Sequence, residues 1–280
     1  MTGGARTAPP DGGPDPRTVS GPLVPGVPGS PFDVDVLLDR YPDRPGPAGD
    51  PESVCALLAR HGIGAAAVCS LRGALFDVDA GNAETAAVAE RYPQLVPVST
   101  VDLRDGLRAE RCIERMAADG VRVLRLFPEE QHADPDFPGF RHVARRAAEH
   151  GMVVLTGGDV RRVWRPFAGL GATVVFLDTH FYHLADFVLL ARDEPGFHTS
   201  TRLLNSVDSL ELVAAEVGVE RMVLGTRAPL YEPTVPLLRL ARSGLSEAER
   251  ALVAGGTARR LFGLDGAGAP AVGNAEEERS

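Results

Sequence analysis

The chain has 280 residues, a net charge of −9 and an isoelectric point near 5.3. This length suits one large α/β domain or two small ones, and the acidic balance excludes the basic surface with which proteins bind nucleic acid. No stretch approaches the about 20 apolar residues of a membrane span, and the N-terminus lacks the apolar core of a signal peptide. We therefore expect a small-molecule substrate as the partner, with no nucleic acid and no membrane.

The three cysteines, Cys55, Cys69 and Cys112, are odd in number and show no CxxC spacing. They are predicted to be reduced thiols in the protein core. Such thiols are typical of a cytoplasmic protein, and that is the location we expect.

The two ends of the chain differ in composition from the middle. Residues 1–30 are dominated by Gly and Pro and contain few apolar residues, so they are predicted to be disordered. Residues 265–280 are rich in Gly and Ala and then acidic, which predicts a flexible tail. One folded domain is expected over residues 31–264.

Within this domain, short apolar runs alternate with helical segments. The eight expected strands are Phe32–Leu38, Ala65–Ser70, Leu95–Val101, Val121–Phe127, Met152–Thr156, Thr173–Asp178, Phe197–Arg202 and Met222–Thr226. One helix is expected to begin at Asp50-Pro51, and the others are Asn82–Arg91, Leu107–Asp119, Phe140–His150, Leu184–Arg192, Ser206–Val217, Pro233–Arg242, Ser246–Ala254 and Thr257–Phe262.

This alternation predicts a (β/α)8 TIM barrel, in which eight parallel strands form a closed ring. An open Rossmann-like sheet is the alternative, but no GxGxxG motif follows the first strand. The weakest part of the pattern is Val160–Leu170, a poor helix with Pro166 inside it. For the helix before the last strand, Ser206 is the expected N-cap and Gly218 the expected C-terminal stop.

Catalytic residues of such barrels lie at the carboxyl ends of the strands and in the loops that follow. The polar residues at these positions are Asp33, Asp35, Ser70, Arg72, Thr100, Asp102, Arg125, Thr156, Asp159, Asp178, His180, Thr201, Arg202, Asn205 and Arg227.

The last strand indicates a family. The buried run Met222–Leu224 ends in Gly225-Thr226-Arg227-Ala228-Pro229. Together with the preceding helix, it resembles the last βα step of the amidohydrolase-related superfamily, where the strand usually reads Gly-Ser-Asp-x-Pro. The resemblance covers residues 31–264. It implies cleavage of C–N, C–O or C–C bonds, by hydrolysis of amides and lactones or by decarboxylation of aromatic acids, and it suggests a homodimer.

The positions that hold the catalytic metal in that family are largely substituted. On the first strand, Asp35 and Leu37 stand where the family has two histidines, and Thr156 replaces the histidine of the fifth strand. The histidine of the sixth strand aligns near Asp178, and Arg227 replaces the aspartate of the eighth. A leucine side chain cannot bind a metal, and a guanidinium repels one. We therefore expect no metal ligands and no cofactor, with a rewired divalent site such as zinc as the minor alternative.

The remaining polar residues define a candidate site that works through protons and hydrogen bonds. His180 is the expected acid or base, oriented by Asp35 or Asp178. Arg125 or Arg227 is expected to bind a substrate anion. For Arg227 the favoured alternative is an internal ion pair with Asp35, and Arg125 either faces the mouth or lies under a loop.

Three further polar residues, Thr156, Thr201 and Asn205, are expected to contact substrate at the rim, whereas Asp33 is expected to brace the first strand. The leading hypothesis is a diverged hydrolase or lyase that acts on a small acidic or cyclic metabolite. The first alternative is a non-catalytic ligand-binding or scaffold barrel, and the second is a metal-dependent hydrolase with rewired ligands. A mouth closed by an Arg227–Asp35 pair favours the non-catalytic barrel, and an open pocket of several hundred cubic ångströms favours the enzyme.

Overall fold

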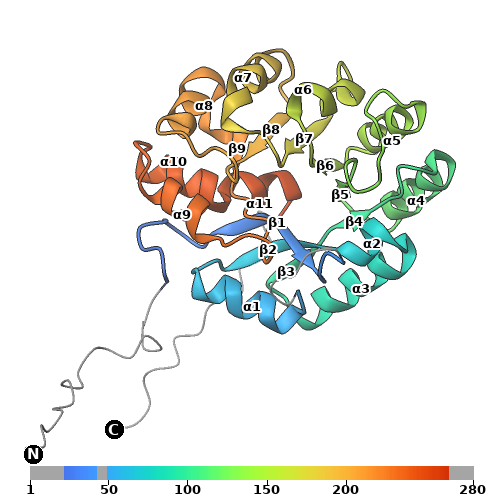
Figure 1. The fold of residues 1–280 in the computed structure, drawn as a ribbon, viewed down its shortest axis with the longest axis horizontal. Coiled ribbons are helices and arrows are strands. Elements are labelled where there is room, and N and C mark those ends of the chain that lie inside the picture. Colours follow the sequence, from blue (N-terminus) through green and yellow to red (C-terminus); the bar gives the residue numbers. More distant parts are fainter. Residues whose placement is uncertain (1–21, 43–48, 265–280) are drawn as a thin grey trace, which may run out of the picture.

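The computed structural model describes residues 22–42 and 49–264 (Figure 1). The predicted tail, 265–280, and residues 1–21 of the predicted disordered segment lie outside this part. Residues 22–30 are described, and they pack on the domain rather than apart from it. The backbone N–H of Leu23 donates to the carbonyl of Arg60 at 3.1 Å, and Val24 is buried. The packed part of the chain therefore begins before residue 31.

The strands are all parallel and follow one another around the fold in chain order. They are β1 (Phe32–Leu38), β2 (Ala65–Ser70), β3 (Leu95–Pro97), β4 (Ser99–Thr100), β5 (Val123–Leu126), β6 (Val153–Thr156), β7 (Thr173–Phe176), β8 (Phe197–Ser200) and β9 (Met222–Val223).

The ring closes at two places where no regular pairing is assigned. Only Val98 separates β3 from β4, and its N–H donates to the carbonyl of Val68 at 2.9 Å, so the two segments form one interrupted strand. On the other side, the N–H groups of Val34 and Leu37 in β1 donate to carbonyls of the segment that begins after β9, at 2.9 and 2.8 Å. The described residues therefore form eight parallel strands in a ring, as predicted.

Helices surround this ring (Figure 1). They are α1 (Pro51–Arg60), α2 (Leu71–Leu75), α3 (Val78–Arg91), α4 (Gly106–Ala118), α5 (Pro138–Glu149), α6 (Val160–Val163), α7 (Leu184–Asp193), α8 (Ser209–Val217), α9 (Thr234–Ala241), α10 (Glu247–Ala251) and α11 (Thr257–Phe262). Shorter 3-10 turns occupy Arg165–Phe167, Phe181–His183 and Val219–Arg221, and a π-helical turn occupies Leu252–Gly256. In the described part of the chain, no helix has the length and apolar character needed to cross a membrane.

The helix caps show where local sequence decides the structure. Asp50 caps α1 as predicted, since its side chain accepts a hydrogen bond from the N–H of Ser53. The predicted N-cap of α8 is wrong, because the helix begins at Ser209 with Asp208 in the cap position. The carbonyl of Ser206 instead accepts hydrogen bonds from the hydroxyl of Ser209 and the guanidinium of Arg239. The Ser206 carbonyl, which would accept a helical hydrogen bond if α8 began earlier, is thus engaged by these two side chains.

The inside of the barrel is apolar towards the N-terminal ends of the strands and polar towards their carboxyl ends, which form the mouth. Val123, Val153, Val175 and Val223 belong to one buried cluster with Phe262 of α11, which fills the N-terminal end of the ring. Side chains alternate along a strand, so the residue two positions after Val123 in β5 lies on the same inner face. This places the side chain of Arg125 above the apolar layer, at the carboxyl ends of the strands.

Candidate active site

The carboxylate of Asp35, in the middle of β1, is the buried centre of the charged cluster beneath the barrel mouth. The side chain of Asp35 has no exposed surface. Arg125 of β5 places its Nη2 atom 2.6 Å from Asp35 Oδ1, and the Nε–H of Arg227 donates to Asp35 Oδ2 at 3.2 Å. The predicted Arg227–Asp35 pair is therefore present, and the Arg125 side chain points into the barrel, where it is buried against Asp35.

A second carboxylate, that of Asp178, joins the cluster just after β7. Asp178 Oδ2 accepts hydrogen bonds from the N–H of Gly158 at 2.9 Å and from Arg227 Nη2 at 3.0 Å. Arg202, just after β8, forms an ion pair with Asp178 Oδ1, and its Nε atom lies 3.8 Å from Asp35 Oδ2. Arg227 thus bridges the two aspartates, with Arg202 beside them.

This cluster carries one more positive charge than negative, because three guanidiniums face two carboxylates. Burial opposes ionisation of Asp35, but Arg125, Arg227 and Arg202 outweigh it and hold the pKa of Asp35 below its ordinary value. Burial and, to a smaller extent, the neighbouring Arg227 together lower the pKa of Arg202 to about 10. Arg202 therefore remains charged at neutral pH in a place that disfavours its charge, so an incoming anion would stabilise it.

The backbone around Arg227 is held in an unusual conformation. Arg227 has φ of 59°, in the left-handed region that residues other than glycine seldom adopt. The other described non-glycine residues with positive φ, Asp39 and His132, lie in loops at the same end of the barrel. Strain of this kind persists only where the surrounding structure imposes it, and it is common at functional sites.

Above the cluster lies an open cavity of about 980 Å³, a size that admits a small molecule. Its apolar wall includes Tyr231, whose ring lies 5.3 Å from the guanidinium carbon of Arg202. The other residues around it are Tyr41, Pro42, Leu75, Glu129, Glu130, His132, Gly158, Asp159, Asp178, His180, Tyr182, His183, Leu203, Arg227 and Leu230.

His180 lines this cavity, as predicted, but Asp178 does not orient it. Both oxygens of Asp178 are engaged by Arg202, Arg227 and Gly158, and the described residues show no hydrogen bond between Asp178 and His180. Instead the N–H of Tyr182 donates to His180 Nδ1 at 3.3 Å, and the two rings stack with their centroids 4.7 Å apart. Nε2 is therefore the ring nitrogen left to face a substrate.

Like Arg125, which is buried against Asp35, three further predicted substrate contacts do not line the cavity. Thr156 is fully buried and donates to the carbonyl of Gly157, and Thr201 is buried where its hydroxyl accepts from the N–H of Gly225. Asn205 is exposed beyond the residues that line the cavity. The first two therefore support the strand ends in the structure instead of meeting a ligand.

Asp33 has the bracing role expected for it. Its carboxylate accepts hydrogen bonds from the hydroxyl of Thr226 at 2.5 Å, from the N–H of Thr226 at 3.1 Å and from the N–H of Asp35 at 2.9 Å. Asp33 thus joins β1 to the segment after β9.

Most residues of the cavity wall were not among the predicted site residues, and Arg202 and Glu129 are the two that matter most for a charged ligand. Arg202 was recognised at a strand end, but sequence alone does not show that its guanidinium reaches two aspartates from other strands. Glu129 lies in the loop after β5, where no motif marks it.

No protein-family model matches the sequence, and no curated protein sequence matches it. Solved structures do. The chain is similar to 2,6-dihydroxybenzoate decarboxylase from Rhizobium, with a TM-score of 0.67 and 14% identity over 85% of this chain and 99% of that one. The chain is also similar to a protein named as an amidohydrolase from Staphylococcus aureus, with a TM-score of 0.66 and 12% identity over 84% of this chain and 100% of that one. This chain has the same barrel fold as these structures. At such low identity, the similarity confirms the predicted fold and shows nothing further about this chain.

The expectation that this barrel has no cofactor is wrong, because structures with the same fold contain bound manganese. One is a dihydroxybenzoic acid decarboxylase from Polaromonas sp. JS666, with a TM-score of 0.64 and 12% identity over 84% of this chain and 97% of that one. A second decarboxylase of this fold also holds manganese.

The mouth of this barrel, as its side chains are arranged, does not fit that ion. Asp35 and Asp178 both pair with guanidiniums, and the described residues contain no group of three or more His, Cys, Asp or Glu that could hold a metal.

Proposed function

We propose that this protein is a hydrolase or lyase that cleaves a small acidic or cyclic metabolite in the mouth of its barrel. The observation that carries this proposal is the uneven ion cluster at the base of the open cavity, where three guanidiniums face two carboxylates. A substrate carboxylate or enolate would supply the missing negative charge. The names of the similar structures, which include decarboxylases of small aromatic acids, support the same substrate class.

Arg202 is the residue assigned to bind the anion. Its Nε atom is buried and has no hydrogen-bond partner among the described residues, since the nearest oxygen of Asp35 is 3.8 Å away. Arg227 holds Asp35 and Asp178 in place and contributes charge beside Arg202. His180 is the residue assigned to transfer a proton, through Nε2.

A non-catalytic ligand-binding barrel is the second candidate, because Arg227 is paired with both aspartates. The open cavity favours the enzyme, since this pairing leaves about 980 Å³ lined by both His180 and Arg202. We also propose a cytoplasmic location, which the free thiols of Cys55, Cys69 and Cys112 support.

The proposal predicts that His180→Ala loses turnover without losing the fold. Purified protein is incubated with a panel of hydroxybenzoic acids and aromatic lactones, with and without added manganese, and substrate loss is followed by chromatography. We expect turnover of at least one compound, and a fall of about 100-fold or more in His180→Ala because proton transfer is removed. His150→Ala is the matched control, since His150 is exposed at the end of α5.

Thermal unfolding checks that both variants remain folded. Full turnover by folded His180→Ala would contradict the role of His180. Absence of turnover across the panel, together with binding of the same compounds, would favour the non-catalytic barrel.

A further inference from the structure

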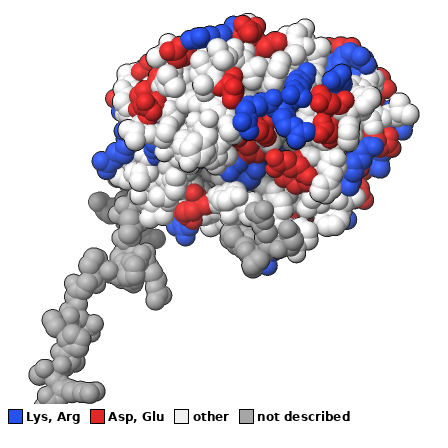
Figure 2. Space-filling model, turned by 45° about the horizontal axis from the view of Figure 1, so that its top comes forward, with Lys and Arg blue, Asp and Glu red and all other residues white. Residues whose placement is uncertain are grey.

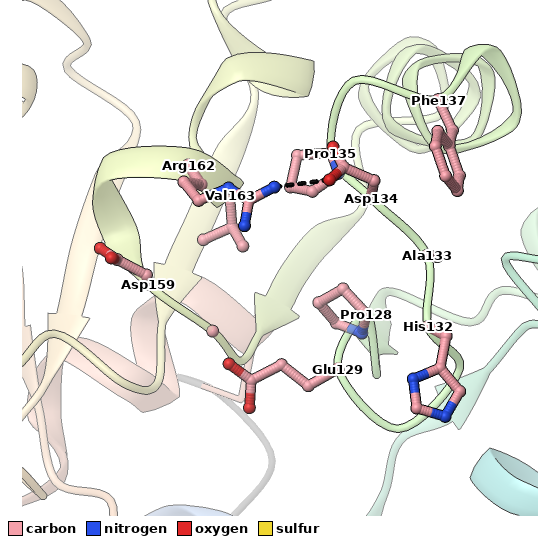
Figure 3. Close-up of a pocket in the computed structure, with 11 residues that line it drawn as sticks. Pro128, Glu129, His132, Ala133, Asp134, Pro135, Phe137, Asp159, Arg162 and Val163 are labelled. Carbon is pink, nitrogen blue, oxygen red and sulfur yellow. Dashed lines mark hydrogen bonds and ion pairs between the residues drawn. The ribbon is translucent and has the colours of Figure 1, made fainter.

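The mouth cavity continues beside Glu129 into a second cavity of about 510 Å³, between the loops that follow β5 and β6. The two cavities share Glu129, His132, Gly158 and Asp159 as wall residues. Figure 3 shows the Glu129 side chain extending from its own loop towards the loop that carries Asp159, while the Asp159 carboxylate points away from it. Glu129 therefore stands where the two cavities join.

The Glu129 carboxylate differs from the other carboxylates of the cavity wall because it has no partner. Glu130 accepts a hydrogen bond from the hydroxyl of Tyr41 at 3.0 Å, and Asp159 caps α6 and pairs with Arg161. Asp178 is held by the arginine cluster. Among the residues that the structure describes, the Glu129 carboxylate makes no hydrogen bond and no ion pair; only the Glu129 backbone carbonyl has a partner, the N–H of His132 at 3.2 Å. It is the carboxylate available to a ligand.

Glu129 and the arginine cluster flank the same two-residue segment of backbone. A Cβ atom added to Gly157 would lie 2.8 Å from Asp178 Oδ2 and 3.6 Å from Arg227 Nη2. A Cβ atom added to the next residue, Gly158, would lie 3.5 Å from Glu129 Oε1. Since consecutive Cα atoms are only about 3.8 Å apart, Glu129 and Arg227 approach adjacent residues of the same loop, and both line the mouth cavity.

We propose that the ligand of this cavity is a small zwitterion, with its carboxylate on Arg202 and its ammonium group on Glu129. The inference rests on the proposed function, because it takes the anion site at Arg202 as given and adds the other end of the molecule. A cationic group beside Glu129 gains a charge-assisted hydrogen bond. A second anionic group there meets Glu129 and the neighbouring Glu130, which repel it. The cavity thus selects against dicarboxylates.

Calorimetric titration of the full chain at pH 7.5 with three probes of one shape tests this selection. The probes are 4-(aminomethyl)benzoate, a zwitterion; 4-methylbenzoate, a monoanion; and terephthalate, a dianion. We expect the zwitterion to bind about tenfold more tightly than 4-methylbenzoate, and terephthalate to bind more weakly than either. In Glu129→Gln, the zwitterion and 4-methylbenzoate should bind alike, while the affinity for 4-methylbenzoate is maintained or rises. Glu129 is exposed, so this substitution leaves the fold intact.

Glu130→Gln is the matched control, because it removes the same charge one residue away and should keep the preference for the zwitterion. If Glu130→Gln also loses the preference for the zwitterion, the preference arises from the general negative potential of this region and not from a contact with Glu129. That result would overturn the inference. Equal binding of the zwitterion and 4-methylbenzoate by the unaltered protein would also overturn it, while leaving the anion site standing. Failure of all three probes to bind would contradict the proposed function itself.

Discussion

Arg227 shows how a single residue reorganises the barrel mouth. The sequence offered two roles for it, an ion pair with Asp35 or a contact with a substrate anion. The structure shows the ion pair, and adds a second contact with Asp178 that sequence could not reveal. Arg202 is also paired with Asp178, but its Nε–H has no hydrogen-bond partner among the described residues, and for this reason we assign the anion to Arg202.

Asp33 is the second residue whose environment has a measurable consequence. Burial raises the pKa of Asp33 to about 7 from an ordinary 3.8, although hydrogen bonds from Thr226 and Asp35 favour its charged form. The folded protein therefore keeps a proton that the unfolded chain has already lost. This stabilising contribution is fully present below about pH 4 and is lost as the pH rises towards 7.

We expect the free energy of unfolding of the unaltered protein to fall relative to Asp33→Asn between pH 5 and pH 7, by about 1.4 kcal/mol per pH unit. Urea unfolding of both proteins at several pH values measures the difference. Asp193→Asn, at the exposed end of α7, is the control and should run parallel to the unaltered protein. If the Asp33→Asn curve is parallel as well, then Asp33 is ionised in the folded state and the pKa assigned to it is wrong.

At the scale of elements, strand positions were predictable where the apolar run is buried on both sides. The bounds of β1 and β2 match the sequence interpretation, because every residue of β1 and all but the first of β2 are buried. The last strand is shorter than expected, since it ends at Val223 and the chain then turns to carry Arg227 into the mouth. The short α2 was not expected, because it follows β2 without a break in the sequence pattern.

The candidate site was predictable only as a set of strand ends. Asp35, Asp178, Arg125 and Arg227 do converge, as the barrel requires. Sequence does not show which of these groups pair and which remain free for a ligand. The pairing depends on how far each side chain extends towards strands that are distant in the sequence. For the same reason Thr156 and Thr201 seemed available for substrate, although their hydroxyls serve the backbone of neighbouring loops.

The closure between β1 and the segment after β9 gives a prediction at this scale. The Thr226 hydroxyl donates to Asp33 Oδ2 and accepts from the N–H of Ala228 at 3.1 Å. Thr226→Val leaves both buried partners unsatisfied, so we expect a loss of about 1–3 kcal/mol in the free energy of unfolding. Thr226→Ser keeps the hydroxyl and should retain most of the free energy of unfolding. Urea unfolding at pH 7 compares them, and a Val variant as stable as the unaltered protein would show that the closure does not depend on this hydroxyl.

For the whole molecule, the charge of the buried arginine–aspartate cluster opposes that of the chain. The protein carries a net charge of −9, and acidic and basic side chains are interspersed over the face shown in Figure 2. The overall charge repels a small anion, and salt screens this repulsion beyond about 10 Å at 0.1 M. Affinity for an anion must therefore come from the local excess of guanidinium in the barrel mouth.

A crystal structure of the protein soaked with 4-methylbenzoate tests this central claim most directly. We expect a carboxylate oxygen within about 3 Å of a guanidinium nitrogen of Arg202, with the ring against Tyr231 and with Arg227 still joining Asp35 to Asp178. A mouth in which Arg202 stays closed on Asp178, while the ligand lies elsewhere on the molecule, would contradict it.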